Sequence, residues 1–208
     1  MLTIKDKMRS RNQSRWHTVS TAQQQNVAEH SHCGGILAED LLIKLYLGAG
    51  GTASIEEKYH VLKYFQMHDL PELITGDWPT PIKRYLEKVL PNFKAVMHKI
   101  ELQICPELAE YEVLFNDKPY LKHICKAADM LEALSFFLYA QGLDKQHNEV
   151  VFDKLRTGLT DLIATAQAQC PHFDWSVIAS LAHELEFGES SVINFETLLT
   201  LPELPVVA

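Results

Sequence analysis

The chain has 208 residues, of which 47% are hydrophobic, and a formal net charge of -8 at pH 7. This length is sufficient for one domain with a well-buried core. The acidic balance argues against a protein that wraps the nucleic acid backbone, and no apolar run approaches the ~20 residues that span a bilayer. The four cysteines form no CxxC pair and the N-terminus lacks an apolar signal core, so we expect reduced thiols in a cytoplasmic protein.

Helical periodicity runs through the chain, whereas alternating strand patterns are nearly absent. A first helix is predicted over residues 26–48, with Gly48 as its C-cap. A second helix, over residues 54–69, opens with Ser54 and Glu57 at the spacing of a capping box. Six more helical segments are predicted at residues 82–90, 92–104, 106–115, 119–142 (closed by Gly142), 148–169 and 174–188. We expect a single all-α domain over residues 1–208, a bundle of about eight helices with a C-terminal tail at 186–208.

The stretch "MHDLPELITGDWPTP" is unusually polar for a chain of apolar helices. It contains His68 and Asp69, which mid-helix would point about 100° apart. Because Pro71 disfavours helical geometry at the residue before it, the helix is expected to end near Asp69. Both side chains could then turn toward one point.

Two distant residues are the best candidates for completing a metal site with this pair. His30 lies in the first turn of the helix over 26–48, and Asp129 lies in the apolar segment "KAADMLEAL". A carboxylate among apolar neighbours is costly to bury unless it is paired or bound to a cation. Two imidazoles and two carboxylates suit Mn, Co, Fe, Zn or Mg. On residue types alone, a salt-bridged Asp129 and a chance His-Asp pair are the alternatives.

The ordered set of a histidine in "AEHS", then "HD", then an aspartate in "KAAD" resembles the HD-domain metal phosphohydrolases. More narrowly, "RW" upstream of "NVAEHS", followed by "HDLPELITGDWPTPIK" and "KAADMLEAL", resembles the 5'-deoxynucleotidase branch over roughly residues 12 to 140. The resemblance implies an HD-domain helical bundle with one divalent metal ion, which could be Co, Mn, Mg, Zn or Fe. It places the metal ligands at His30, His68, Asp69 and Asp129.

The resemblance also implies roles for residues around the metal. Glu72 would assist proton transfer at the attacking water, next to Asp69, although it could instead only cap a short helix. Arg15 would hold phosphate oxygens with its planar fork and act in catalysis. Trp16 would pack against the sugar and exclude a 2'-hydroxyl, the alternative being ordinary core packing.

The loop "GDWPTP" is expected to contact the nucleotide by the same resemblance. Asp77 would accept a hydrogen bond from the sugar 3'-hydroxyl, with the alternative of a simple polar turn. The other expected substrate contacts are Trp78, Pro79, Thr80 and Lys83. Lys126 is a weaker phosphate candidate, and His17 and Thr18 are candidates for facing the base.

The expected activity is metal-dependent hydrolysis of 2'-deoxynucleotides, with a 5'-deoxynucleotidase that releases phosphate from dNMPs as the main hypothesis. The alternative is a dNTP triphosphohydrolase, similar to viral dATPase-like enzymes, that releases triphosphate. A second alternative is a non-catalytic nucleotide-sensing protein. The partner is therefore a small-molecule deoxynucleotide rather than a nucleic acid or a membrane. We also expect a homodimer or a larger homo-oligomer.

Overall fold

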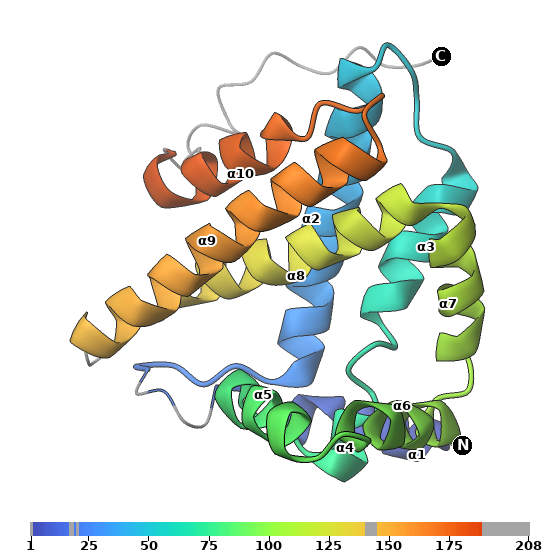
Figure 1. The fold of residues 1–208 in the computed structure, drawn as a ribbon, viewed down its shortest axis with the longest axis vertical. Helices are drawn as coiled ribbons and strands as arrows, with labels where there is room; N and C mark the ends of the chain where they lie inside the picture. Colours follow the sequence, from blue (N-terminus) through green and yellow to red (C-terminus); the bar gives the residue numbers. More distant parts are fainter. Residues whose placement is uncertain (1, 17–18, 20, 140–144, 189–208) are drawn as a thin grey trace, which may run out of the picture.

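The computed structural model describes residues 2–16, 19, 21–139 and 145–188, and every regular element within them is a helix (Figure 1). The all-α fold predicted from the periodicity is therefore confirmed. The elements are α1 (Ile4–Lys7), the 3-10 helix η1 (Met8–Asn12), α2 (Val27–Gly48), α3 (Ile55–Phe65), α4 (Glu72–Thr75), α5 (Thr80–Val89), α6 (Phe93–Ile104), α7 (Leu108–Asp117), α8 (Pro119–Tyr139), α9 (Lys145–Gln169) and α10 (Ser176–Phe187).

The eight predicted helices correspond to α2, α3 and α5 to α10. The single-turn helices α1 and α4 were not predicted, because four residues are too few to show a period. The C-cap prediction at Gly48 was wrong by one residue: Gly48 is the last residue of α2, Ala49 caps it, and the left-handed residue is Gly50 at φ 73°. Gly142 and most of the predicted tail lie outside the described residues. No described helix combines the length and apolar character needed to cross a membrane.

Side-chain caps fix where α2, which carries His30, and α3, which precedes His68 and Asp69, begin. Asn26 accepts from the Glu29 amide at 3.0 Å in a capping box, which starts α2 and sets His30 in its first turn. The capping box predicted from Ser54 and Glu57 is confirmed at the start of α3.

The core lies where α2 and α8 pack together, with α3, α9 and α10 around them (Figure 1). α2 and α8 supply fully buried leucines and isoleucines, including Leu41, Leu42, Ile124 and Leu131. Their burial contributes about 1.5–3 kcal/mol for each side chain. The helix pair is thus a rigid frame for the polar residues near the start of α2.

The segment before α2 is held against the beginning of that helix. The Arg15 amide donates to the Gln25 carbonyl at 2.8 Å, and the Val27 amide donates to the Gln13 carbonyl at 3.0 Å. Trp16 follows with φ 58°, in the left-handed region that non-glycine residues rarely adopt. This strained backbone sets the direction in which the Trp16 side chain leaves the chain.

Candidate active site

Three of the four predicted metal ligands converge at the N-terminal end of α2. His30, His68 and Asp69 each offer a ligand atom, and these atoms all lie within 4.8 Å of one another. His30 Nε2 is 3.3 Å from His68 Nε2 and 3.4 Å from Asp69 Oδ2. Two imidazoles and a carboxylate at this separation fit a divalent transition metal.

The chain reaches this arrangement because α3 ends before the His-Asp pair. The helix stops at Phe65, four residues earlier than predicted, and the His68 amide turns back to the Tyr64 carbonyl at 2.9 Å. The His68 ring stacks on Tyr64 with centroids 4.9 Å apart and meets the edge of Phe65 at 5.0 Å. Burial lowers the pKa of His68, which favours the neutral imidazole that binds metals.

Asp129 approaches the same point from α8. Its Oδ1 lies 3.5 Å from His30 Nε2, and its Oδ2 accepts from Lys126 at 2.8 Å. Burial alone would raise the pKa of Asp129, but Lys126 and the two imidazoles outweigh it and lower this pKa. Asp129 is therefore both salt-bridged and beside the cluster, which combines the two alternatives raised by the sequence.

Arg15 places a guanidinium directly on this cluster, where it forms an ion pair with Asp69. Burial alone would lower the pKa of Arg15, but Asp69, Glu72 and other nearby carboxylates raise it, so the group stays charged. Its Nε is buried and has no hydrogen-bond partner within the described residues. That free donor is suited to an anionic ligand.

Glu72 opens α4 next to these charges. Pro71 precedes it and provides no side-chain cap. Within the described part of the chain, Glu72 Oε2 is buried without a hydrogen-bond partner. Burial, together with the charges of Asp69 and Asp77, raises the pKa of Glu72 to about 9. This burial and these charges favour the protonated form of Glu72.

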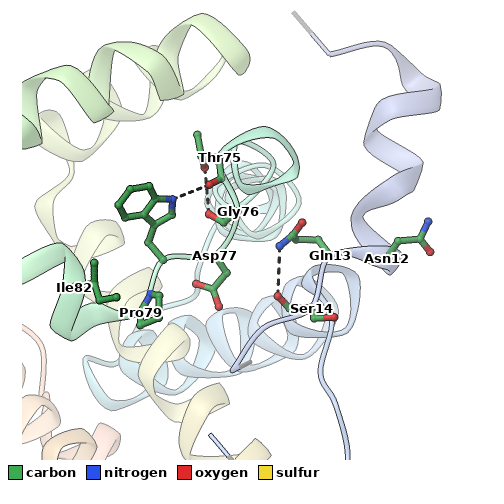
Figure 2. Close-up of a pocket in the computed structure, with 9 residues that line it drawn as sticks. Asn12, Gln13, Ser14, Thr75, Gly76, Asp77, Pro79 and Ile82 are labelled. Carbon is green, nitrogen blue, oxygen red and sulfur yellow. Dashed lines mark hydrogen bonds between the residues drawn. The ribbon is translucent and has the colours of Figure 1, made fainter. Parts of the chain in front are cut away.

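An open cavity of about 550 Å³ lies between the segment before Arg15 and the "GDWPTP" loop (Figure 2). The proposed metal ligands are not among its lining residues, but Asp77 on its wall is close enough to raise the pKa of both Arg15 and Glu72. Three of the residues that we predicted to contact the substrate, Asp77, Trp78 and Pro79, line one side of the cavity. Two others, Thr80 and Lys83, are exposed at the start of α5. The remaining lining residues are Asn12, Gln13, Ser14, Thr75, Gly76 and Ile82.

The loop keeps its shape through its own bonds. The Trp78 indole donates to the Thr75 carbonyl at 2.7 Å. This bond holds Trp78 in its place in the cavity wall. Gly76, at φ 77°, makes the turn from α4 into the loop that a side chain would strain.

Trp16 packs edge-on against Phe137 of α8, with ring centroids 4.7 Å apart. Its indole Nε1 donates to Gln25 Oε1 at 3.0 Å. The orientation of Trp16 is therefore fixed by α8 and by the residues before α2. His17 and Thr18, the candidates for facing the base, lie outside the described residues.

Two buried residues at the site were not found by sequence reasoning. Glu132 Oε2 contacts His30 Nδ1 at 2.6 Å, and Glu132 Oε1 accepts from Gln25 Nε2 at 2.5 Å. The available signal was a second carboxylate in the same apolar helix, one turn after Asp129.

The helical fold and the His-Asp cluster define an HD phosphohydrolase, a hydrolase of phosphate ester bonds. A solved structure titled "Cyanophage S-2L HD phosphohydrolase (DatZ) bound to dA and one catalytic Zn2+ ion" is 28% identical, with a TM-score of 0.67 over 89% of this chain and 95% of that one. The family model described as 5'-deoxynucleotidase YfbR-like matches residues 6–175. The chain belongs to this YfbR-like family.

Relatives with two different activities match over most of their length. The dATP triphosphohydrolase of Cyanophage S-2L is 30% identical over 168 residues, which cover 79% of this chain and 87% of that protein. The 5'-deoxynucleotidase YfbR of Salmonella arizonae is 30% identical over 165 residues, covering 75% and 79%. The family resemblance seen in the sequence is confirmed.

Proposed function

We propose that this chain hydrolyses 2'-deoxynucleotides at the bond between the 5'-oxygen and the α-phosphorus, with one divalent metal ion. The observation that carries the proposal is the convergence of His30, His68 and Asp69 within 4.8 Å of one another, beside Arg15 and Glu72. Asp129 is the proposed fourth ligand. When bound, the ion would polarise phosphate oxygens and lower the pKa of water.

Arg15 and Glu72 supply the other parts of this chemistry. Arg15 binds phosphate oxygens through its planar fork, including the unpartnered Nε, and stabilises the charge that grows as water attacks phosphorus. In its ionised form Glu72 accepts the proton of that water. A bound metal ion would favour this form through its positive charge, against the burial and neighbouring carboxylates that raise the pKa of Glu72. The new bond joins the water oxygen to phosphorus, while the 5'-oxygen leaves and takes up a proton.

The cavity along the "GDWPTP" loop is the proposed site for the deoxynucleoside, because the charge of Asp77 on its wall acts on both Arg15 and Glu72. Asp77 accepts from the sugar 3'-hydroxyl, with Trp78 and Pro79 in the wall. Thr80, exposed at the start of α5, is a further proposed contact. Trp16, locked against Phe137, borders the sugar and leaves no space for a 2'-hydroxyl. Under this proposal the enzyme selects deoxynucleotides over ribonucleotides.

The main hypothesis is a dNMP substrate that yields phosphate, in line with the family description. A dNTP substrate is the second candidate, and an observation on α5 favours it. Lys83 is exposed, yet near enough to Glu72 to oppose the rise of its pKa. Its charge could meet additional phosphates, and a relative of this chain is named a dATP triphosphohydrolase.

A product assay tests both candidates. Protein supplied in turn with Zn²⁺, Mn²⁺ and Co²⁺ is incubated with each dNMP and dNTP, and the deoxynucleoside, phosphate and triphosphate are separated. We expect deoxynucleoside and phosphate from dNMPs, loss of turnover in Asp69→Asn, and unchanged turnover in the surface variant Glu149→Gln. Deoxynucleotide binding without turnover under every metal would instead support the nucleotide-sensing alternative.

We also infer a cytoplasmic protein that forms at least a homodimer and binds no nucleic acid. The four free cysteines support the inference of a cytoplasmic protein. The inference of a homodimer is supported by a stripe of apolar side chains on α5, where Ile82, Tyr85 and Val89 are 48%, 64% and 45% exposed. The net charge of -8 supports the inference that the chain binds no nucleic acid.

A further inference from the structure

A continuous chain of hydrogen bonds joins Trp16 to the metal-ligand candidate His30. Trp16 Nε1 donates to Gln25 Oε1 at 3.0 Å, and Gln25 Nε2 donates to Glu132 Oε1 at 2.5 Å. Glu132 Oε2 then meets His30 Nδ1 at 2.6 Å. Gln25, His30 and Glu132 are 4%, 0% and 3% exposed. Water therefore has little access to these bonds, and each is strengthened by its low-dielectric surroundings.

Glu132 is an expensive residue to bury in this position. Its ionic contact within the described residues is with His30, and no lysine or arginine of that part of the chain pairs with it. A buried carboxylate is retained only where its hydrogen bonds compensate for lost hydration. Here both of its oxygens are used, one by His30 and the other by Gln25.

The contact with Glu132 fixes which ring nitrogen of His30 carries the proton. With the proton on Nδ1, His30 donates to Glu132, and the lone pair of Nε2 faces His68 and Asp69. A carboxylate behind a ligand histidine orients the ring and increases its basicity toward a metal. Glu132 thus prepares the one nitrogen that points into the cluster.

The direction of donation along these hydrogen bonds is also fixed. The side chain at the centre must accept one bond and donate the other, which the amide of Gln25 can do. Gln25 must present its carbonyl oxygen to the indole N–H and its amino group to the carboxylate. If the Gln25 amide were flipped, its amino group would face the indole N–H of Trp16, and two hydrogen-bond donors would meet. The position of the indole and the position of the His30 ring are therefore linked through two buried side chains.

We propose that Gln25 and Glu132 are positioning residues that hold His30 and Trp16 as one unit, so that binding of the metal and orientation of Trp16 are coupled. This rests on the proposed function, in which His30 binds the metal and Trp16 borders the sugar. The coupling links the metal centre to the wall that selects the deoxyribose. An enzyme built in this way receives the nucleotide in the correct position once the metal is bound.

The variant Glu132→Gln tests the proposal because it keeps the size of the side chain. The new amide can take two orientations. In one, its amino group meets the amino group of Gln25, so that two donors face each other; in the other, its amino group faces His30 Nδ1, which moves the His30 proton to Nε2 and removes the lone pair there. Zn²⁺ affinity is measured by competition with a chromophoric chelator, and the variant is expected to bind about 10–100-fold more weakly than wild type. Glu149→Gln, an exposed change on α9, is expected to keep wild-type affinity.

The second measurement follows the indole itself. Zn²⁺ is expected to change the tryptophan emission of wild type, and this change is expected to disappear in Trp16→Phe although Trp78 and Trp175 remain. Gln25→Met leaves every proposed metal ligand in place, and it is expected to bind Zn²⁺ while losing the emission change. It therefore tests the proposal even if Glu132→Gln fails to fold.

Three results would overturn the inference. If Glu132→Gln binds Zn²⁺ as tightly as wild type, Glu132 does not position His30. If the Zn²⁺-dependent emission change persists in Trp16→Phe or Gln25→Met, the indole is not coupled to the metal through Gln25. If wild type itself binds no Zn²⁺, Mn²⁺ or Co²⁺, the proposed function fails as well. If wild type binds metal but the variants behave like it, only the proposed coupling through Gln25 and Glu132 fails.

Discussion

Gly34 is the position where the packing of α2 most directly controls the site. It lies one turn after His30, and a methyl group added there would overlap the ring of Phe65. Phe65 is fully buried, and its ring centroid is 6.1 Å from that of His30 and 5.0 Å from that of His68. We therefore expect Gly34→Ala to displace Phe65 and, with it, the two imidazoles.

The magnitude follows from two opposing effects. Replacing a helical glycine by alanine stabilises a helix by about 1 kcal/mol. Overpacking a well-filled core costs about 1–3 kcal/mol. The sum predicts that the free energy of unfolding of Gly34→Ala falls by up to about 2 kcal/mol. Gly48, in the same helix, has no neighbour within 4 Å of an added Cβ, so Gly48→Ala is the matched control and keeps only the favourable effect.

Urea denaturation of both variants, with the Zn²⁺ affinity of each, tests this reasoning. Gly34→Ala is expected to be less stable than Gly48→Ala and to bind Zn²⁺ more weakly than wild type. Trimming the obstructing ring in Gly34→Ala/Phe65→Leu is expected to recover part of the lost affinity. The reasoning is refuted if Gly34→Ala is as stable as Gly48→Ala and binds Zn²⁺ like wild type.

Three further predictions concern single residues. Asp129→Ala is expected to lose bound metal in elemental analysis while its far-UV circular dichroism stays helical; unchanged metal content would exclude Asp129 as a ligand. Trp16→Ala is expected to raise kcat/KM for ribonucleotides relative to deoxynucleotides, and an unchanged ratio would mean that Trp16 only packs. Burial alone would raise the pKa of Glu57, but hydrogen bonds from Tyr120 and Tyr46 lower it to about 2. The pKa of Glu57 in the folded protein is therefore below the usual 4.5. These hydrogen bonds stabilise the fold by at most about 3 kcal/mol above about pH 5, and this contribution is lost as the pH falls toward 2. Glu57→Gln is therefore expected to be less stable than wild type at pH 7 and to approach it near pH 3 in urea denaturation, whereas a constant difference would contradict the pKa argument.

The sequence was sufficient where the determining interactions are local. The capping box of Ser54 and Glu57, the break around Pro91 and the start of α2 before His30 are each encoded within a few residues. The end of α3 was predicted four residues late, because the turn after Phe65 is stabilised by packing of His68 on Tyr64. That contact forms only in the folded site, so helix propensity alone cannot predict where α3 ends.

The parts of the site that sequence reasoning missed depend on contacts between distant segments. Gln25 and Glu132 are 107 positions apart, and their bond exists only because the residues before α2 are held beside α8. Neither residue belongs to a motif by itself. The left-handed backbone of Trp16 was equally hidden, since tryptophan has no preference for that conformation.

One pattern in α8 nevertheless connects the sequence to the site. Asp129 and Glu132 are three residues apart, so both project from one face of the helix. Asp129 Oδ1 lies 3.5 Å from His30 Nε2, and Glu132 Oε2 lies 2.6 Å from His30 Nδ1. A single helix thus contacts both nitrogens of the same imidazole, with one carboxylate on the metal side and the other behind the ring. In this chain, therefore, the two carboxylates spaced three apart in α8 hold one histidine between them, and the pair marks the site more clearly than either carboxylate alone.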